Sequence, residues 1–118
     1  NDAKDLQEIY EKFELEKQFL ADYTSVNKRV RKNIMVMLTR LYVTDDPTQI
    51  DATHNSKINS LGFPIYHMET ADGYRLYYAY SKTSAKPIHI LCHCIKSKEA
   101  VYFNKMKNSE TFKKKFRN

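Results

Sequence analysis

The strongest constraint on the fold of this chain is a β-hairpin signal in its second half. Two apolar-rich segments, Ile65–Glu69 and Tyr74–Tyr80, flank the turn residues Ala71-Asp72-Gly73. An Asp-Gly pair between two such segments favours a tight turn, because glycine readily adopts the positive φ that the turn needs. The sequence therefore predicts two neighbouring antiparallel strands, with Arg75 near the start of the second strand.

Further strands and a helix are predicted on both sides of this hairpin. Tyr10–Leu15 alternates apolar and polar residues, which favours a short strand, and Ile88–Ile95 is an apolar run of strand length. Glu16–Ser25 has apolar residues at helical spacing. Asn27 then interrupts this run and is a suitable N-cap for a following helix.

The clearest helix follows Asn27. Its apolar residues recur at the spacing of one helix face, and they are Val30, Ile34, Met37, Leu38 and Leu41. The opposite face is basic and carries Lys28, Arg29, Arg31, Lys32 and Arg40. This pattern predicts an amphipathic helix that packs against a core on one side only.

These elements give the order β–α–α–β–β–β–α in a single α+β domain, since 118 residues suffice for one core. Thr44–Asn59 is polar and aperiodic, which predicts one long connection, and Lys98–Lys107 is the predicted closing helix. Residues 1–9 are interpreted as an extension and 109–118 as a basic tail. We expect a first strand, a helical hairpin, an antiparallel three-stranded meander and a short C-terminal helix, with the helices over one face.

The charge of the chain is distributed unevenly. The net charge is +6, and Lys28–Thr44 contains five basic residues and no acidic one. Such polarity is typical of proteins that bind an anionic partner, although a solvated charged surface is the alternative interpretation. No apolar run is long enough to cross a membrane and no signal-peptide pattern occurs, so a cytoplasmic protein is expected.

The two cysteines indicate reduced thiols. Cys92 and Cys94 lie two residues apart on a predicted strand, so they share one face and are too close in sequence for an ordinary disulfide. His93 points to the other face, where it is expected together with His89, and no second ligand pair has zinc spacing. We expect neither a metal nor a cofactor.

Residues at the strand ends predict a site for a phosphodiester. Arg75 follows the turn, Lys96 ends the next apolar strand, and Tyr102 lies six residues further on. Arginine makes a planar two-pronged contact with phosphate, whereas lysine acts as a point charge or, with a lowered pKa, as a proton donor. Lys98 and Lys57 are candidates for additional phosphate contacts.

The order and the motifs of this chain resemble the RelE/ParE superfamily of bacterial toxin–antitoxin proteins. The resemblance extends over residues 10–108, nearly the whole chain. The segments that carry it are Phe13–Tyr23 with Val30-Arg31, the Gly-Tyr-Arg-Leu-Tyr-Tyr block at 73–78, and Ile88–Cys94 with Lys96 and Val101-Tyr102.

The resemblance implies a small cytoplasmic toxin that a cognate antitoxin blocks. The RelE-like branch cleaves mRNA, usually on the ribosome, and the ParE-like branch poisons DNA gyrase. Cleavage of RNA without metal needs a base for the 2′-hydroxyl, a cation for the phosphate and an acid for the leaving group. The expected function is therefore a metal-independent endoribonuclease, with a gyrase inhibitor or an inactive, antitoxin-binding member as alternatives.

The resemblance also implies roles for single residues. Arg75 matches the RelE-like arginine, Lys96 stands where the family often has an arginine, and Tyr102 stands where it has a tyrosine. On the strand before the turn the family can carry two lysines, and this chain has His67 and Glu69 there. Histidine and carboxylate are the more usual general bases, so His67 is a catalytic candidate and Glu69 an RNA-contact candidate.

Each of these residues also has a structural interpretation. Arg75 can pair with Glu69 or Asp72 across the hairpin. Tyr102 can pack the last helix against the sheet. The sequence alone leaves these alternatives open.

Overall fold

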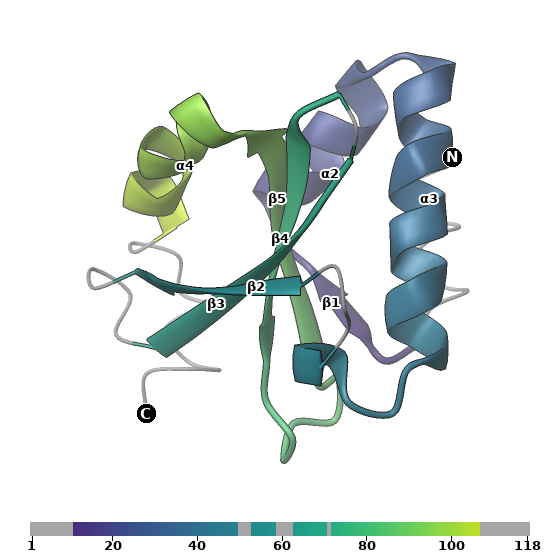
Figure 1. The fold of residues 1–118 in the computed structure, drawn as a ribbon, viewed down its shortest axis with the longest axis vertical. Helices are drawn as coiled ribbons and strands as arrows, with labels where there is room; N and C mark the ends of the chain where they lie inside the picture. Colours follow the sequence, from purple (N-terminus) through teal and green to yellow (C-terminus); the bar gives the residue numbers. More distant parts are fainter. Residues whose placement is uncertain (1–10, 50–52, 59–62, 71, 107–118) are drawn as a thin grey trace.

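The computed structural model of this protein describes residues 11–49, 53–58, 63–70 and 72–106 (Figure 1). The helices are α2 (Lys17–Ser25), α3 (Lys28–Val43) and α4 (Glu99–Met106), with short 3-10 turns η1 (Pro47–Gln49) and η2 (Lys96–Lys98). The strands are β1 (Phe13–Leu15), β2 (Thr53–Ile58), β3 (Phe63–Glu69), β4 (Tyr74–Tyr80) and β5 (Ile88–Ile95). No helix among the described residues is both long and apolar enough to cross a membrane.

The strands form one mixed sheet in the order β1-β5-β4-β3-β2. β1 runs parallel to β5, and the other neighbours are antiparallel. The predicted α+β class and the meander of β3, β4 and β5 are confirmed. The connection predicted over Thr44–Asn59 is wrong in part, because it contains β2, which pairs with β3 from Thr53 opposite Met68 to Ile58 opposite Phe63. β2 lies at the edge of the sheet, where a strand pairs through its backbone and needs no alternation of apolar residues. The residues of β2 therefore carry no pattern that predicts a strand.

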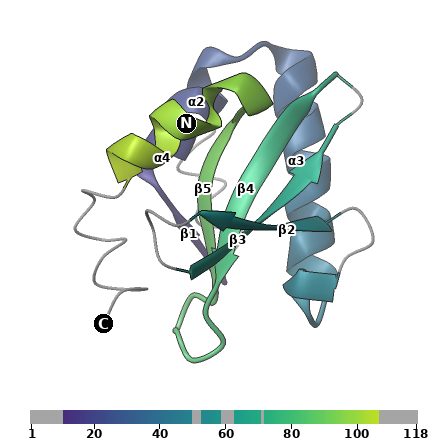
Figure 2. The same ribbon diagram turned by 60° about the vertical axis from the view of Figure 1, so that its left-hand side comes forward.

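Helices cover both faces of the sheet, which corrects the expectation of one covered face. Figure 2 shows α3 and α4 on opposite sides of the sheet. The first core lies under α2 and α3 and includes Phe13, Phe19, Ile34, Leu38, Leu41, Met68, Leu76, Tyr78, Ile88 and Ile90. The second core lies under α4 and consists of Ile65, Tyr77, Ala79, Leu91, Cys92, Cys94 and Phe103.

A bulge in β5 changes which side chains face each core. Tyr77 lies opposite Cys92 while Tyr78 lies opposite Ile90, so Leu91 is an extra residue between them. Because side chains alternate along a strand, one extra residue exchanges the two faces for the rest of the strand. Cys92 and Cys94 therefore share the α4 face, as predicted for the pair.

The same bulge separates the two histidines of β5. His89 lies opposite Ala79 of the second core, and His93 lies opposite Leu76 of the first core. The expectation that His89 and His93 share one face is therefore wrong. The alternation rule fails here because it assumes a strand without a bulge.

Local signals explain the best-predicted elements. The side chain of Asn27 accepts a hydrogen bond from the backbone N–H of Val30 at 3.0 Å, so its predicted capping role is confirmed. The buried face of α3 consists of the five predicted apolar residues. In the hairpin, Gly73 has a φ of 86°, which is the conformation that favours glycine.

Asp22 of α2 closes the edge of β5 that β1 leaves open. β1 pairs with β5 only from Ile88 to Ile90. Beyond that point, Oδ2 of Asp22 accepts the backbone N–H of His93 at 3.3 Å, and Oδ1 accepts the hydroxyl of Tyr102 at 3.3 Å. Burial raises the pKa of Asp22, while its hydrogen bonds act in the opposite direction. One buried carboxylate therefore connects α2, β5 and α4.

We expect Asp22→Ala to lower the free energy of unfolding by about 2–3 kcal/mol, because a buried N–H and a half-buried hydroxyl lose their acceptor. Asp22→Asn retains a side-chain oxygen and should cost clearly less. Urea unfolding at neutral pH measures both changes. Gln18→Ala is the matched control, since it removes only the 2.9 Å bond from Gln18 to Asp22. Equal losses for the Ala and Asn variants would contradict this role.

Candidate functional site

Arg75 lies on the face of the sheet that α4 covers, opposite Cys94. Its side chain is only 16% exposed, and its Nε lies 3.3 Å from Oε1 of Glu69 across the hairpin. Its Nη1 lies 4.0 Å from Oε2 of Glu99, the first residue of α4. The pairing of Arg75 with Glu69 that the sequence left as an alternative is therefore present, and a second carboxylate joins it.

Tyr77 lies beside Arg75 on the same face and connects it to α4. Its hydroxyl donates to Oε2 of Glu99 at 2.5 Å. Burial and the bond to Glu99 raise the pKa of Tyr77, although a hydrogen bond with Arg75 acts in the opposite direction. The phenol therefore keeps its proton and holds the carboxylate of Glu99 in place.

We call Glu69, Arg75, Tyr77 and Glu99 the Arg75 cluster. Burial lowers the pKa of Arg75, but its hydrogen bonds with Tyr77 and Glu69 outweigh burial and raise it, so the guanidinium stays charged. The two carboxylates are more accessible than the arginine, with side chains exposed by 42% for Glu69 and 28% for Glu99. The cluster is therefore a recessed cation with acidic groups at its entrance.

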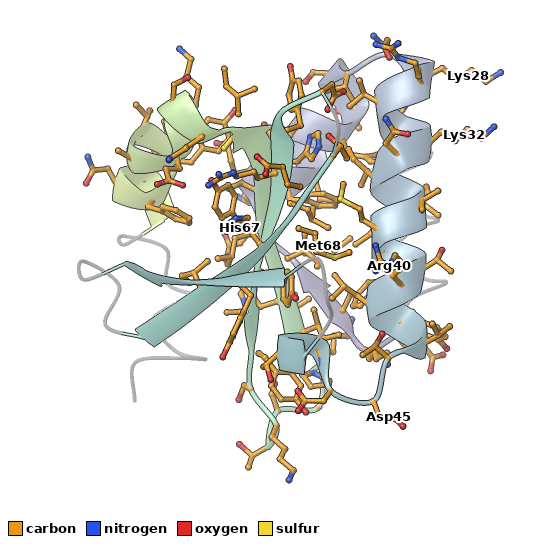
Figure 3. The ribbon with its side chains drawn as sticks, viewed as in Figure 1. Lys28, Lys32, Arg40, Asp45, His67 and Met68 are labelled. Atoms are coloured by element: carbon orange, nitrogen blue, oxygen red, sulfur yellow. The ribbon has the colours of Figure 1, made fainter. Side chains whose placement is uncertain are left out.

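His67 lies behind this cluster rather than at its entrance. It is 5% exposed, and its ring lies against the ring of Tyr77 with the centroids 5.5 Å apart. Phe103 packs edge-on against the same ring at 5.1 Å. Figure 3 shows His67 and its neighbour Met68 on opposite sides of β3, in keeping with the place of Met68 in the first core.

The other predicted site residues are not part of the Arg75 cluster. Lys96 and Lys98 are exposed on η2, where their side chains form no ion pair with the described part of the chain. Tyr102 points to Asp22, and burial together with this carboxylate raises the pKa of Tyr102 to about 12. Lys57 lies on β2 beside Pro64, and its side chain is outside the described residues. The structure thus brings together His67, Glu69 and Arg75, but not Tyr102.

Sequence reasoning missed Tyr77 and Glu99. Tyr77 could have been found, because a strand places it on the same face as Arg75, two residues away. Glu99 carried no local signal. Its position beside Arg75 depends on the direction in which α4 leaves β5, which is set by the packing of Phe103 on the second core.

No metal site is apparent in the described parts of the chain, where no group of three or more His, Cys, Asp or Glu residues could hold an ion. Cys92 and Cys94 are free and buried. Burial, followed by a hydrogen bond with Cys94, raises the pKa of Cys92 well above its ordinary value. Its thiol is therefore protonated, which makes it a poor nucleophile.

Comparisons with models of protein families, with curated proteins and with solved structures give no significant match for this chain. The chemistry of the Arg75 cluster consequently has to be argued from its geometry. A guanidinium can hold a phosphate by two parallel hydrogen bonds, and a nearby carboxylate can accept a proton. These two capacities occur within 3.3 Å of each other at Arg75 and Glu69.

We expect the hydrogen bond between Tyr77 and Glu99 to stabilise the cluster. Tyr77→Phe should lower the free energy of unfolding by about 1–2 kcal/mol, because the Glu99 carboxylate loses the hydroxyl that donates to it. Glu99→Gln added to Tyr77→Phe should cost little more, so a double-mutant cycle in urea should give an interaction energy of about 1 kcal/mol. Gln18→Ala is the control partner and should show almost no interaction with Tyr77→Phe, because Gln18 lies on α2 and bonds Asp22.

His93 lies outside the cluster and is expected to make the fold sensitive to acid. Its ring is 3% exposed, stacks on Tyr74 at 4.9 Å, and has no hydrogen-bond partner at either nitrogen in the described part of the chain. Burial lowers the pKa of His93 to about 4. The folded protein therefore binds this proton less tightly than the unfolded chain does, and stability is lost as the pH falls below about 6.5.

Between pH 7 and pH 5 this difference should remove up to about 2 kcal/mol of stability. His93→Phe keeps an aromatic ring against Tyr74 but cannot titrate, so its free energy of unfolding should fall less over the same range. Urea unfolding at both pH values gives the comparison. An identical pH dependence in the two proteins would show that His93 is not responsible.

Proposed function

We propose that this chain is the toxin of a toxin–antitoxin pair and that it cleaves mRNA as a metal-independent endoribonuclease. The observation that carries the proposal is the Arg75 cluster, in which a recessed guanidinium lies 3.3 Å from an exposed carboxylate. The RelE/ParE-like order of a first strand, a helical hairpin, a meander and a closing helix supports the same class.

In the proposed reaction, the scissile phosphate binds to Arg75 and replaces Glu69 as its partner. The displaced carboxylate of Glu69, 42% exposed, then accepts the proton of the 2′-hydroxyl. The 2′-oxygen attacks phosphorus to form a 2′,3′-cyclic phosphate, while Arg75 stabilises the charge on the phosphoryl oxygens. The bond to the 5′-oxygen breaks, and this oxygen takes a proton from Lys96, which follows β5 directly.

The remaining residues of the cluster act as positioning residues in this proposal. Tyr77 and Glu99 hold Arg75 from the side of α4, at the distances given above. His67 supports the ring of Tyr77 from within the second core. We assign Lys98 and Lys57 to phosphates further along the RNA.

The proposed setting follows from the substrate. mRNA places the protein in the cytoplasm, where buried thiols such as Cys92 and Cys94 also remain reduced. A cognate antitoxin and the ribosome are the proposed partners. We assign no metal or other cofactor to the reaction.

Two observations favour an inactive member that only binds its antitoxin. The charge of Arg75 is already balanced by two carboxylates, so a phosphate has to compete with Glu69 and Glu99 for it. Tyr102 also points to Asp22 and not to Arg75. These contacts make a cleavage assay the decisive experiment.

Arg75→Ala should lower the rate of RNA cleavage by about 100-fold or more, because the transition state loses its charge stabilisation. Arg75→Lys is the matched control: it keeps the charge but not the two-pronged contact, so its activity should lie between the two. Cleavage of a labelled mRNA is measured with and without ribosomes, and urea unfolding shows that each variant is folded.

The proposal is wrong if Arg75→Ala cleaves RNA as fast as the wild-type protein. It is also wrong if the wild-type protein cleaves no RNA under either condition. In that case, trapped gyrase–DNA cleavage complexes would identify a ParE-like inhibitor, and their absence would favour a binding protein.

A further inference from the structure

The outer side of α3 carries a second regular pattern besides the one that faces the core. Every third or fourth residue on this side follows a heptad spacing, and these residues are Arg29, Lys32, Val36, Thr39 and Val43. We call this set the α3 seam. Because the buried residues of α3 have their own spacing on the inner side, the seam is not needed for the fold.

The α3 seam is exposed along its length. Val36 is 56% exposed and Val43 is 71% exposed, whereas the valine of the inner side, Val30, is buried. Arg29 and Lys32 are exposed as well. In Figure 3 the side chains of Lys28 and Lys32 point away from the sheet, and Figure 1 shows no described element over this side of α3.

The chemistry of the seam changes along the helix. Its first half is cationic, with Arg29 and Lys32 flanked by the exposed Lys28. Its second half presents two branched apolar side chains, Val36 and Val43. Valine at alternate seam positions is the type of residue that packs between two helices in a coiled coil.

We propose that the α3 seam is a docking surface for an acidic amphipathic helix of another protein. The partner helix would place apolar residues against Val36 and Val43 and carboxylates against Arg29 and Lys32. The 16 residues of α3 span about 24 Å, which accommodates about two heptads of such a partner. The inference is independent of the proposed ribonuclease activity, since the Arg75 cluster lies on the other side of the sheet.

Charge decides between this partner and a second copy of the chain. Lys28–Val43 contains five basic residues and no acidic one, so two seams brought together would repel each other without compensation. Charge and shape also disfavour a nucleic acid as the main partner. Phosphates would pair with Arg29 and Lys32, but they would leave Val36 and Val43 without an apolar contact.

The test uses a fluorescent synthetic helix of about 21 residues, with leucine at the a and d positions and glutamate at e and g. A peptide of the same composition in scrambled order is its control. Binding to the full chain is followed by fluorescence anisotropy. We expect the heptad peptide to bind, and the scrambled peptide to bind at least tenfold more weakly.

Uncharged substitutions separate the apolar contact from simple charge attraction. The double variant Val36→Gln/Val43→Gln should weaken binding of the heptad peptide at least tenfold. Val101→Gln is the matched control, because Val101 is 52% exposed on α4 and lies away from the seam. Arg29→Glu/Lys32→Glu should also weaken binding and should reduce its dependence on salt. Circular dichroism and urea unfolding verify that each variant is folded.

Three results would overturn the proposal. The first is that the heptad peptide does not bind. The second is that it binds Val36→Gln/Val43→Gln and Val101→Gln equally well. Alternatively, a short single-stranded RNA binds more tightly than the peptide and responds only to Arg29→Glu/Lys32→Glu, which would make the seam a phosphate surface. Arg75→Ala should leave peptide binding unchanged, so failure of the ribonuclease proposal and failure of this one give different results.

Discussion

The arrangement of this fold depends on a single buried carboxylate at an incomplete sheet edge. β1 pairs with β5 only from Ile88 to Ile90. Further along this edge of β5, the carboxylate of Asp22 accepts the backbone N–H of His93. The same carboxylate accepts the hydroxyl of Tyr102, so the position of α4 is tied to that of α2 around the edge of the sheet. Since α4 begins with Glu99, this link acts together with the packing of Phe103 on the second core to place the second carboxylate beside Arg75.

The two faces of the sheet carry different kinds of side chains. The face under α2 and α3 holds most of the large apolar side chains, and the ring nitrogens of its histidine, His93, are buried with no hydrogen-bond partner among the described residues. The face under α4 is smaller and holds the polar groups that contact one another, namely the Arg75 cluster and the two thiols. On this face Arg75 lies beside two carboxylates, whereas the outer side of α3 is basic in its first half and apolar in its second. The candidate site and the candidate docking surface are therefore separated by the sheet itself.

The sequence predicted the elements whose formation depends on residues close together in the chain. The spacing of Val30, Ile34 and Leu41 suffices for α3, and the Asp-Gly pair suffices for the β3–β4 hairpin. β2 could not be predicted, because it is polar and is defined only by its pairing with β3. The pairing of Arg75 with Glu69 followed from the hairpin register, but the approach of Glu99 required the position of α4, which no spacing rule contains. The direction of Tyr102 was open for the same reason.

The bulge at Leu91 has a consequence for how this strand tolerates change. Before Leu91 the even-numbered residues Ile88 and Ile90 face the first core, and after it the even-numbered residues Cys92 and Cys94 face the second core. Deletion of Leu91 would restore a regular strand and would leave Ile90, Cys92 and His93 on the faces that they now occupy, so both thiols would stay in the second core. An exchange of residues between the two halves of β5 that keeps odd numbers with odd numbers would place each side chain in the wrong core. Any redesign or alignment of this strand must therefore reverse the assignment of side chains to the two cores after Leu91.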